Sequence, residues 1–311
     1  MPHVRKALIT TAHGQDSIYL GRLLREKGYE VLVLNHRKTL PLDFNHYDKS
    51  VNVDITNTDS VLTIIKQFCP EEIYNLAAVS SVASSWQNPS LSLEVNGNAV
   101  ARLVSAIARQ SNGRDYKFFQ AGSTDMVGKS LISSKDKEFS PWSPYGHAKE
   151  IARQAVLSAR ENQGLWCVNG ILTNHDSRYR SNTFVIPIIA KQIKEIQKGE
   201  RKAIQLENPL IGRDWAHAKD IMKGAWKMMQ QADPRDLVLA TGVSHTLTEL
   251  IEQCSSTLKM ELKIEQIQSG ITRKSDFTSI KVDAGFAHEI LQWRPEFFGA
   301  STLLSLLQDS D

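Results

Sequence analysis

Short apolar runs alternate with longer amphipathic stretches along the first 172 residues of the chain. The apolar runs predict strands at residues 7–10, 31–34, 51–53, 73–76, 117–120 and 166–172. The stretches between them predict helices at residues 17–27, 59–68, 91–110 and 144–163. Uninterrupted apolar strands that alternate with helices are typical of a parallel sheet covered on both faces. The pattern therefore predicts an α/β fold with a doubly wound parallel sheet, which binds ligands outside the carboxyl ends of its strands.

The alternation changes after Leu172. Two further helices are predicted at residues 183–198 and 219–231, and the rest of the chain mixes short strands and helices. An apolar run at residues 237–240 predicts a strand that rejoins the main sheet. We therefore expect a larger unit of residues 1–172, rejoined by about 216–245, and a smaller α/β lobe of residues 173–311.

The composition is that of an ordinary globular protein, with 41% hydrophobic and 23% charged residues among 311. The formal net charge of +3 is too small to indicate a nucleic acid or a membrane surface as partner. No apolar run approaches the length of a membrane span. The three cysteines, Cys69, Cys167 and Cys254, are far apart and odd in number, which predicts reduced thiols and a cytoplasmic protein. The nine histidines show no metal-ligand spacing, so we expect no metal site.

The first predicted strand leads into the turn TTAHGQDS, residues 10–17, and then into a helix. A turn at this place brings the N–H groups of a helix N-terminus to the pyrophosphate of a dinucleotide. Only Gly14 remains of the glycine pattern expected there, because Thr11 and Ser17 occupy the other glycine positions. Each of these two residues adds a side chain where the backbone should approach the phosphate. A strand, turn and helix without a ligand would show the same local pattern.

No acidic residue closes the second predicted strand, where a carboxylate would bind the ribose 2′-hydroxyl of NAD. The sequence there is Asn35-His36-Arg37-Lys38. Cations at this place favour the 2′-phosphate of NADP, through charge-assisted hydrogen bonds. An exposed basic turn is the alternative interpretation. Asp54, after the third predicted strand, either accepts a hydrogen bond from the adenine amino group or caps the next helix.

Tyr145 and Lys149 lie four residues apart on a predicted helix and therefore share one face of it. We expect the lysine to lower the pKa of the phenol, so that the tyrosine exchanges a proton with a substrate hydroxyl near neutral pH. Upstream, the cluster GSTD, residues 122–125, follows another predicted strand. There Ser123 is placed to bond the substrate oxygen and Asp125 to move a proton. A loop of helix-capping residues is the alternative.

Seven stretches of the chain match one enzyme family. They are TTAHGQDSIYL (10–20), IYNLAAVSSV (73–82), FFQAGSTDMVGK (118–129), SPYGHAK (143–149), GILTNHDS (170–177), RDWAHAKD (213–220) and ATGVSHTLTELIE (240–252). RDWAHAKD and NHDS are narrower than any general Rossmann signature. On these motifs the chain resembles the GDP-mannose 4,6-dehydratase family from about Lys6 to Leu291. That family belongs to the extended short-chain dehydrogenase/reductases of the NAD-dependent epimerase/dehydratase superfamily.

The resemblance implies an NADP-dependent lyase that converts GDP-mannose to GDP-4-keto-6-deoxymannose for deoxysugar biosynthesis, as a homo-dimer or homo-tetramer. NADP takes a hydride from C4 of the sugar while Tyr145, assisted by Lys149, takes the hydroxyl proton. Ser123 contacts the C4 oxygen, and Asp125 stands at the position of the family's glutamate base for C5. Water then leaves from C6, and the hydride returns there.

The same resemblance assigns roles to the two units and to single residues. Residues 1–172 would be the dinucleotide-binding Rossmann domain and residues 173–311 the substrate lobe. The residues that align with cofactor contacts are Thr11, Gly14, Gln15, Asp16, Arg37, Asp54, Ile55, Leu76, Ala77, Ala78, Ser80, Tyr145, Lys149, His175 and Arg180. The residues that align with substrate contacts are Ser85, Asn174, Val185, Arg213 and Arg273. Arginine forks suit the geometry of a diphosphate.

The chain departs from the family pattern near the predicted active site. Asp125 is one methylene shorter than the family's glutamate, so we expect its carboxylate to fall roughly 1 Å short of C5, a displacement that can cost about 100-fold in rate. Val79 and Ser81 replace Gln and His, and residues 186–188 replace a basic stretch that helps to hold the nucleotide. Two other functions stay open: a nucleotide-sugar reductase or epimerase on the same scaffold, and a non-catalytic nucleotide-binding paralogue.

Overall fold

The computed structural model describes residues 3–37, 44–110, 116–128, 130–136, 138–268 and 278–308. Within these residues the centre of the molecule is a parallel sheet of seven strands, in the order β11-β7-β5-β4-β1-β2-β3. The strands are β1 (Lys6–Ile9), β2 (Glu30–Asn35), β3 (Lys49–Asn52), β4 (Glu72–Asn75), β5 (Lys117–Ala121), β7 (Trp166–Leu172) and β11 (Leu237–Leu239). The predicted α/β fold with a doubly wound parallel sheet is confirmed, and β11 is the predicted return strand.

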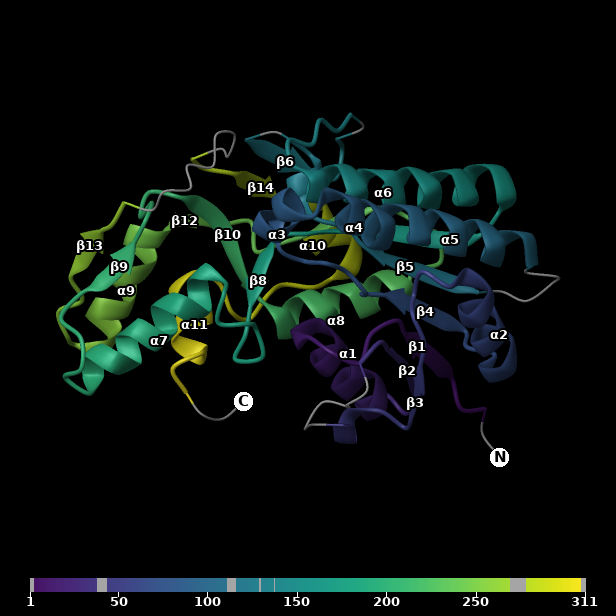
Figure 1. Cartoon of the computed structure of the whole chain (residues 1–311), viewed down its shortest axis with the longest axis horizontal. Helices are drawn as coiled ribbons and strands as arrows, with labels where there is room; N and C mark the ends of the chain where they lie inside the picture. The colour runs from purple at the N-terminus through teal and green to yellow at the C-terminus, as the bar shows by residue number, and fades with distance from the viewer. Residues whose placement is uncertain are drawn as a thin grey trace.

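Helices cover both faces of this sheet, because successive side chains of a strand point to opposite sides. On β1, Leu8 belongs to one apolar core, whereas Ala7 and Ile9 belong to the other. Figure 1 shows α5 and α6 on one side of the sheet and α1 and α8 on the other. The helices over the Leu8 side are α2 (Thr58–Phe68), α5 (Ala99–Gln110) and α6 (Pro144–Gln163), and those over the Ile9 side are α1 (Gln15–Glu26), α8 (Ala218–Met229) and α10 (Gly285–Leu291).

A smaller lobe is built from residues that follow β7, and Figure 1 shows it at the end of the molecule away from the N-terminus. Its three-stranded sheet consists of β8 (Asn174–Asp176), β10 (Gly212–His217) and β12 (Ser244–Thr246). A separate apolar core, which includes Trp215, lies among α7 (Val185–Gln197), α9 (Leu247–Leu258) and α11 (Ala300–Ser305). The remaining strands pair as β9 (Ile204–Leu206) with β13 (Ile264–Gln266) and β6 (Leu131–Ser133) with β14 (Lys281–Asp283).

The predicted elements are present with ends within two residues of the prediction, except for one helix. The helix predicted at residues 91–110 consists of α4 (Pro89–Leu93), a π-helical turn at Glu94–Asn98 and α5. The prediction of one continuous helix was therefore wrong. In the π-helical turn Gly97 lies directly against α6, where a Cβ on it would be 3.1 Å from the carbonyl oxygen of Ala148.

Candidate active site

The first turn of α6 presents the predicted catalytic pair. Ser143 caps the helix, since its Oγ accepts a hydrogen bond from the Gly146 N–H at 3.0 Å. Tyr145 and Lys149 lie on the buried face of this helix and are 8% and 3% exposed. The Nζ of Lys149 lies 5.7 Å from the centroid of the Tyr145 ring and donates a hydrogen bond of 2.8 Å to the carbonyl oxygen of Ala121. The end of β5 therefore fixes the lysine beside the phenol.

Two further predicted residues meet Tyr145 from the loop after β5. The Oγ of Ser123 donates to Oδ2 of Asp125 at 3.2 Å and accepts from the Asp125 N–H at 3.2 Å. The Ser123 hydroxyl also helps to lower the pKa of Tyr145, which places the two side chains next to each other. A Cβ on Gly146 would lie 2.6 Å from the carbonyl oxygen of Asp125, so this loop rests on the helix backbone next to Tyr145. The structure thus brings together the four residues predicted to be catalytic.

The electrostatics of the pair differ from the prediction. Burial raises the pKa of Tyr145 well above its ordinary value, and the charge of Asp125 raises it further. The hydrogen bond from Ser123 and the charge of Arg180 oppose this rise only in part. The predicted net lowering of the phenol pKa was wrong for the protein alone, because removing the phenolate from water costs more than these contacts return.

Burial also lowers the pKa of Lys149, from 10.5 to about 8, against the opposing charge of Asp16. The free-energy cost of burying the ammonium is therefore present below about pH 8 and fades between about pH 8 and 10.5.

Lys149→Met removes this cost and also the bond to Ala121, so we expect the free energy of unfolding at pH 7 to rise by on the order of 1–3 kcal/mol. Chemical denaturation at pH 7 and at pH 10 measures the change, which should shrink at the higher pH. An equal or lower stability at pH 7 would contradict this.

A partly buried ion pair joins the first turn of α1 to β8. The Nε2 of His175 lies 3.0 and 3.1 Å from the two carboxylate oxygens of Asp16, and its Nδ1 donates to the carbonyl oxygen of Thr173 at 2.7 Å. Burial alone would lower the pKa of His175, but the Asp16 charge and hydrogen bond raise it overall. Burial would likewise raise the pKa of Asp16, but His175 lowers it overall. Both shifts favour the charged pair, which ties the two units together.

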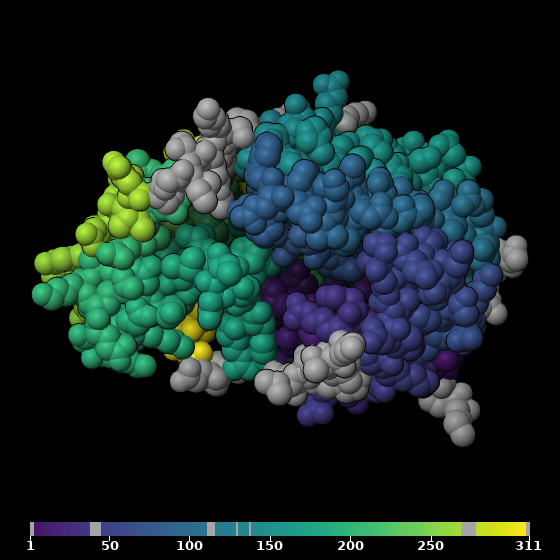
Figure 2. Space-filling model, in the orientation of Figure 1, coloured from purple at the N-terminus to yellow at the C-terminus, as the bar shows by residue number. Residues whose placement is uncertain are grey.

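Gln15, beside this pair, is buried and forms hydrogen bonds with the lobe. Its side chain is 3% exposed. Its Nε2 donates to the carbonyl oxygen of His175 at 2.8 Å, and its Oε1 accepts from Ser177 Oγ at 2.8 Å. The Gln15 side chain therefore holds the lobe in place, and the cofactor contact predicted for this residue stays a prediction. Figure 2 shows the surface hollowed between the two units, with N-terminal residues, in purple, at the floor of the hollow.

Arg180, in the loop after β8, forms a charged cluster with Asp16 and His175. Its guanidinium lies 3.6 Å from the centroid of the Phe184 ring, and its Nε is 3.7 Å from Oδ1 of Asp176. This buried Nε has no hydrogen-bond partner among the described residues. The charge of Arg180 acts on the pKa values of Asp16 and Tyr145. A group with an unsatisfied donor at the meeting point of the two units is suited to an anionic ligand.

The turn between β1 and α1 is open on its outer side. Gly14 has φ +102°, and a Cβ on it would meet no atom within 4 Å. The hydroxyl of Thr11 donates to the carbonyl oxygen of His13 at 3.2 Å. Ser17 is fully buried, and its hydroxyl bonds to the Thr11 carbonyl oxygen and, at 2.8 Å, to the Tyr47 hydroxyl. The expectation that the Ser17 side chain would lie against the phosphate was therefore wrong, because that side chain points into the core.

The carboxyl ends of β2 and β3 carry the other predicted contacts with adenosine. Arg37 is exposed after β2, whereas Lys38 lies outside the described residues. The Oδ1 of Asp54 accepts bonds from the N–H and the hydroxyl of Thr56, at 2.9 and 2.8 Å. Asp54 does not cap α2, since that role belongs to Asn57, whose Oδ1 accepts from the Ser60 N–H. Half-buried Ile55 follows Asp54 in the same turn.

The loop after β4 is held by two residues that the sequence did not single out as functional. Thr10 Oγ1 accepts hydrogen bonds from the N–H groups of Leu76 and Ala77, each at 3.0 Å. Asn96, in the π-helical turn, accepts from the Val79 N–H at 2.8 Å and donates to the Val79 carbonyl oxygen at 3.0 Å. A buried polar residue in an apolar helix is the signal that could have identified Asn96. The loop also carries half-buried Ala78 and exposed Ser80.

The predicted substrate contacts are dispersed. Ser85, on α3 (Val82–Gln87), is fully buried; its hydroxyl donates to the Val82 carbonyl oxygen at 2.7 Å and accepts from the Tyr145 N–H at 3.2 Å. This side chain therefore positions the start of α6, and the substrate contact predicted for Ser85 stays a prediction. Arg213 is 6% exposed and donates to the carbonyl oxygen of Gly212 at 2.7 Å.

The other three predicted substrate contacts differ in what the structure shows of them. Asn174 is exposed on β8, where it pairs with Trp215 of β10. Val185 is the first residue of α7 and is half-buried. Arg273 lies outside the described residues. Asn174 and Val185 therefore bracket the loop that carries Arg180, on the lobe side of the charged cluster.

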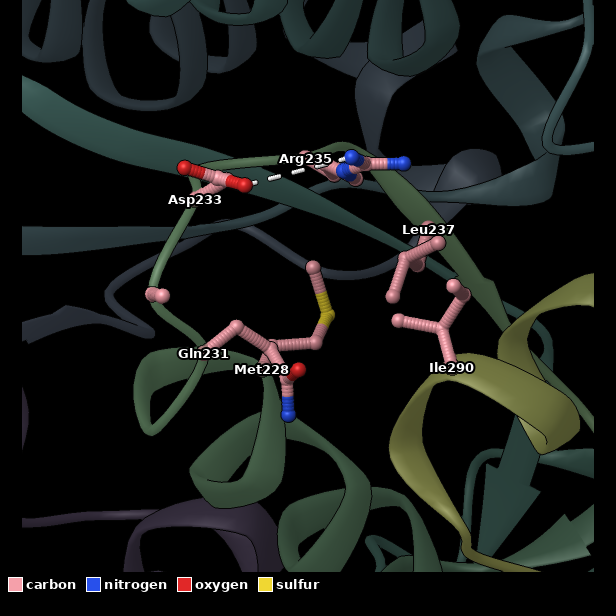
Figure 3. Close-up of a pocket in the computed structure, with 7 residues that line it drawn as sticks. Met228, Gln231, Asp233, Arg235, Leu237 and Ile290 are labelled. Atoms are coloured by element: carbon pink, nitrogen blue, oxygen red, sulfur yellow. Dashed lines mark ion pairs between the residues drawn. The ribbon is translucent and has the colours of Figure 1, made fainter.

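A pocket of about 170 Å³ lies elsewhere, and Figure 3 shows the residues that line it. Met228 of α8 and Gln231, which follows that helix, line the pocket together with Leu237 of β11 and Ile290 of α10. This is the amino end of β11, opposite the end at which the residues predicted to be catalytic follow their strands. In the described part of the chain no group of His, Cys, Asp or Glu residues is arranged to hold a metal ion. Nor does any described helix have the length and apolar character to cross a membrane.

Known proteins are similar to this chain in sequence and in fold. Residues 8–302 match the family model for GDP-mannose 4,6 dehydratase. A GDP-mannose 4,6-dehydratase of Vibrio cholerae is 33% identical over 98% of this chain and 86% of its own length.

The chain belongs to the GDP-mannose 4,6-dehydratase family.

Solved structures of lower sequence identity share the fold of this family member. MoeE5 in complex with UDP-glucose and NAD superposes with a TM-score of 0.81 at 19% identity, covering 97% of both chains. RMD from Pseudomonas aeruginosa complexed with NADPH also gives a TM-score of 0.81 at 19% identity, covering 98% of both chains. The dehydratase family model spans both units described above, so the match is not limited to the dinucleotide-binding part.

Proposed function

We propose that this dehydratase family member converts GDP-mannose to GDP-4-keto-6-deoxymannose as an NADP-dependent nucleotide-sugar 4,6-dehydratase, a hydro-lyase. The observation that carries the proposal is the meeting of Ser123, Asp125 and Tyr145 at one point, with Lys149 behind them. These residue types supply a hydroxyl donor, a carboxylate base, a phenol and a cation. The match to the family model over residues 8–302 supports the choice of substrate.

The residues divide the proton transfers between them. Bound NADP would accept the hydride from C4 and return it to C6. Tyr145 takes the proton of the C4 hydroxyl, while the Ser123 hydroxyl bonds the same oxygen. Asp125 takes the proton at C5, which the 4-keto group acidifies, and passes it to the departing C6 hydroxyl, which leaves as water. Tyr145 then returns its proton to C5, so that the enzyme ends as it began.

The residues present fit a nicotinamide dinucleotide. Gly14 leaves open space at the start of α1, where helix N–H groups and the helix dipole favour a pyrophosphate. The unsatisfied Nε of Arg180 lies in the charged cluster between the units. Lys149, which projects from α6 beside Tyr145, is placed to meet the nicotinamide ribose. We accordingly propose residues 1–172, rejoined by about 216–245, as the cofactor domain and most of the remaining residues of 173–311 as the substrate lobe, with α10 packed on the cofactor domain.

We expect NADP to bind at least ~10-fold more tightly than NAD, which corresponds to about 1.4 kcal/mol. Arg37 is exposed at the carboxyl end of β2, where a cation meets a 2′-phosphate and where NAD-dependent enzymes carry a carboxylate. Arg37→Ala should remove most of the preference and leave the affinity for NAD nearly unchanged. Isothermal titration calorimetry with both cofactors measures this. Equal affinities in the unmodified protein would refute the NADP assignment.

A single experiment tests the reaction itself. The purified protein is incubated with GDP-mannose and a catalytic amount of NADP, and the product is analysed by mass spectrometry. Loss of one water from the sugar supports the dehydratase. A product formed only with stoichiometric NADPH would indicate a reductase. The hydrogen bond from Ser123 to the short side chain of Asp125 would favour that second interpretation. No product from any GDP, UDP, CDP or dTDP sugar would indicate a non-catalytic paralogue.

We also propose that the enzyme is cytoplasmic and acts as a homo-dimer or homo-tetramer. The scattered, odd-numbered cysteines support the first statement. The second follows from the family resemblance alone. Light scattering of the purified protein at micromolar concentration distinguishes these assemblies from a monomer.

A further inference from the structure

A second basic side chain approaches the end of β2 from a different part of the chain. His13 lies in the turn between β1 and α1, directly before Gly14. Its Nε2 is 3.0 Å from Oδ1 of Asn35, the last residue of β2. Its ring meets that of His36 edge to face, with the centroids 5.8 Å apart and the planes at 73°. Because β1 and β2 are neighbours in the sheet, their carboxyl ends bring these residues together.

Asn35 determines how this group is arranged. Its Nδ2 donates to the Arg37 carbonyl oxygen at 2.7 Å, and its Oδ1 accepts from the Arg37 N–H at 3.0 Å. These two bonds settle which end of the amide is the oxygen, so His13 must donate to it through Nε2. Arg37 Nε in turn approaches His36 Nε2 at 3.4 Å. One asparagine thus holds His13 and the backbone of Arg37 in a fixed relation.

The group is rich in donors and in positive charge. It combines a guanidinium with two imidazoles, and imidazoles become cations readily when an anion binds beside them. The charge of His36 helps to lower the pKa of Asp54, after the bonds from Thr56, which places this carboxylate within electrostatic reach of the group. Asp54 itself is exposed and engaged by Thr56. A site of this composition at a strand end is suited to a phosphate monoester.

We infer that His13, together with Arg37, determines cofactor specificity by donating a hydrogen bond through its Nδ1 to the ribose 2′-phosphate. The inference rests on the proposed NADP dependence. The bond requires the doubly protonated ring, which holds Asn35 with one N–H and the phosphate with the other. NAD has a hydroxyl at this position and gains little from such a cation. The sequence signal is a histidine directly before the glycine of the pyrophosphate turn.

The test compares the affinities of the whole protein for NADP+ and NAD+ by isothermal titration calorimetry. His13→Ala should weaken NADP+ binding by about 5-fold, the low end for a hydrogen bond to a charged group near solvent. It should leave NAD+ binding within about 2-fold, since Gly14 and the backbone N–H groups at the start of α1 are kept. His13→Gln, which keeps a donor for Asn35 but carries no charge, should lose a similar factor. Arg25→Ala removes an exposed cation from the last turn of α1 and is the matched control, with no expected change.

The outcomes separate this inference from the cofactor assignment. A selective loss of NADP+ affinity in both His13 variants supports it. If the unmodified protein prefers NADP+ and Arg37→Ala abolishes the preference while His13→Ala keeps it, the inference is overturned and the assignment stands. Equal losses for NADP+ and NAD+ in the His13 variants also overturn it, because they indicate a structural role in the turn. No preference in the unmodified protein overturns the assignment and the inference with it.

Discussion

Tyr145→Phe is expected to lower turnover by about 100-fold or more, while the fold and the affinity for NADP stay nearly unchanged. The substitution removes the group that exchanges a proton with the C4 hydroxyl and keeps the buried aromatic ring. It also removes the interaction of the phenol with the Ser123 hydroxyl, which is a smaller, structural loss. Steady-state rates with GDP-mannose measure the effect, and calorimetry with NADP confirms that the site is intact.

Tyr116→Phe is the matched control for this prediction. Tyr116 is 6% exposed, as buried as Tyr145, but it precedes β5 at the amino end of the sheet. Its hydroxyl is therefore remote from the proposed chemistry, and its removal should leave turnover unchanged. Full activity of Tyr145→Phe would move the catalytic site elsewhere.

Asp125→Asn is expected to abolish the loss of water while C4 oxidation remains possible, so that absorbance of the reduced cofactor builds up on the enzyme. An amide cannot take the proton from C5, but it is nearly isosteric and can still accept a bond from Ser123 Oγ. Stopped-flow absorbance at the nicotinamide band measures the build-up, and mass spectrometry measures the missing product. A mild effect, with turnover that requires added NADPH, would favour the reductase.

Asp125→Glu sharpens the same test. The added methylene restores the reach of the family's glutamate, so this variant should keep activity and gain in rate if the short side chain limits the reaction. Asp233→Asn is the matched control: its side chain is 78% exposed at the rim of the pocket in Figure 3, and the change should have no effect. Loss of activity in Asp125→Glu as complete as in Asp125→Asn would argue against a base at this position.

Local information in the sequence was enough for much of this protein. The apolar runs predicted the strands of the main sheet, and the bounds of α6 and β7 were as predicted. The spacing of Tyr145 and Lys149 places them on one helix face whatever the rest of the chain does. The order of strand ends also indicated that Ser123 and Asp125 would lie near them, because the carboxyl ends of parallel strands meet at one edge. These features depend on residues close together in the chain or on the regular geometry of the sheet.

Contacts between distant residues and the balance of burial were decided only by the tertiary structure. Asp16 finds His175 at a separation of 159 residues, and Ser17 turns inward to Tyr47, which no local pattern indicates. The pKa of Tyr145 rises instead of falling, because its sign depends on how completely the phenol is removed from water. Such properties are sums over everything that packs around a group, and the sequence alone does not say which residues those are.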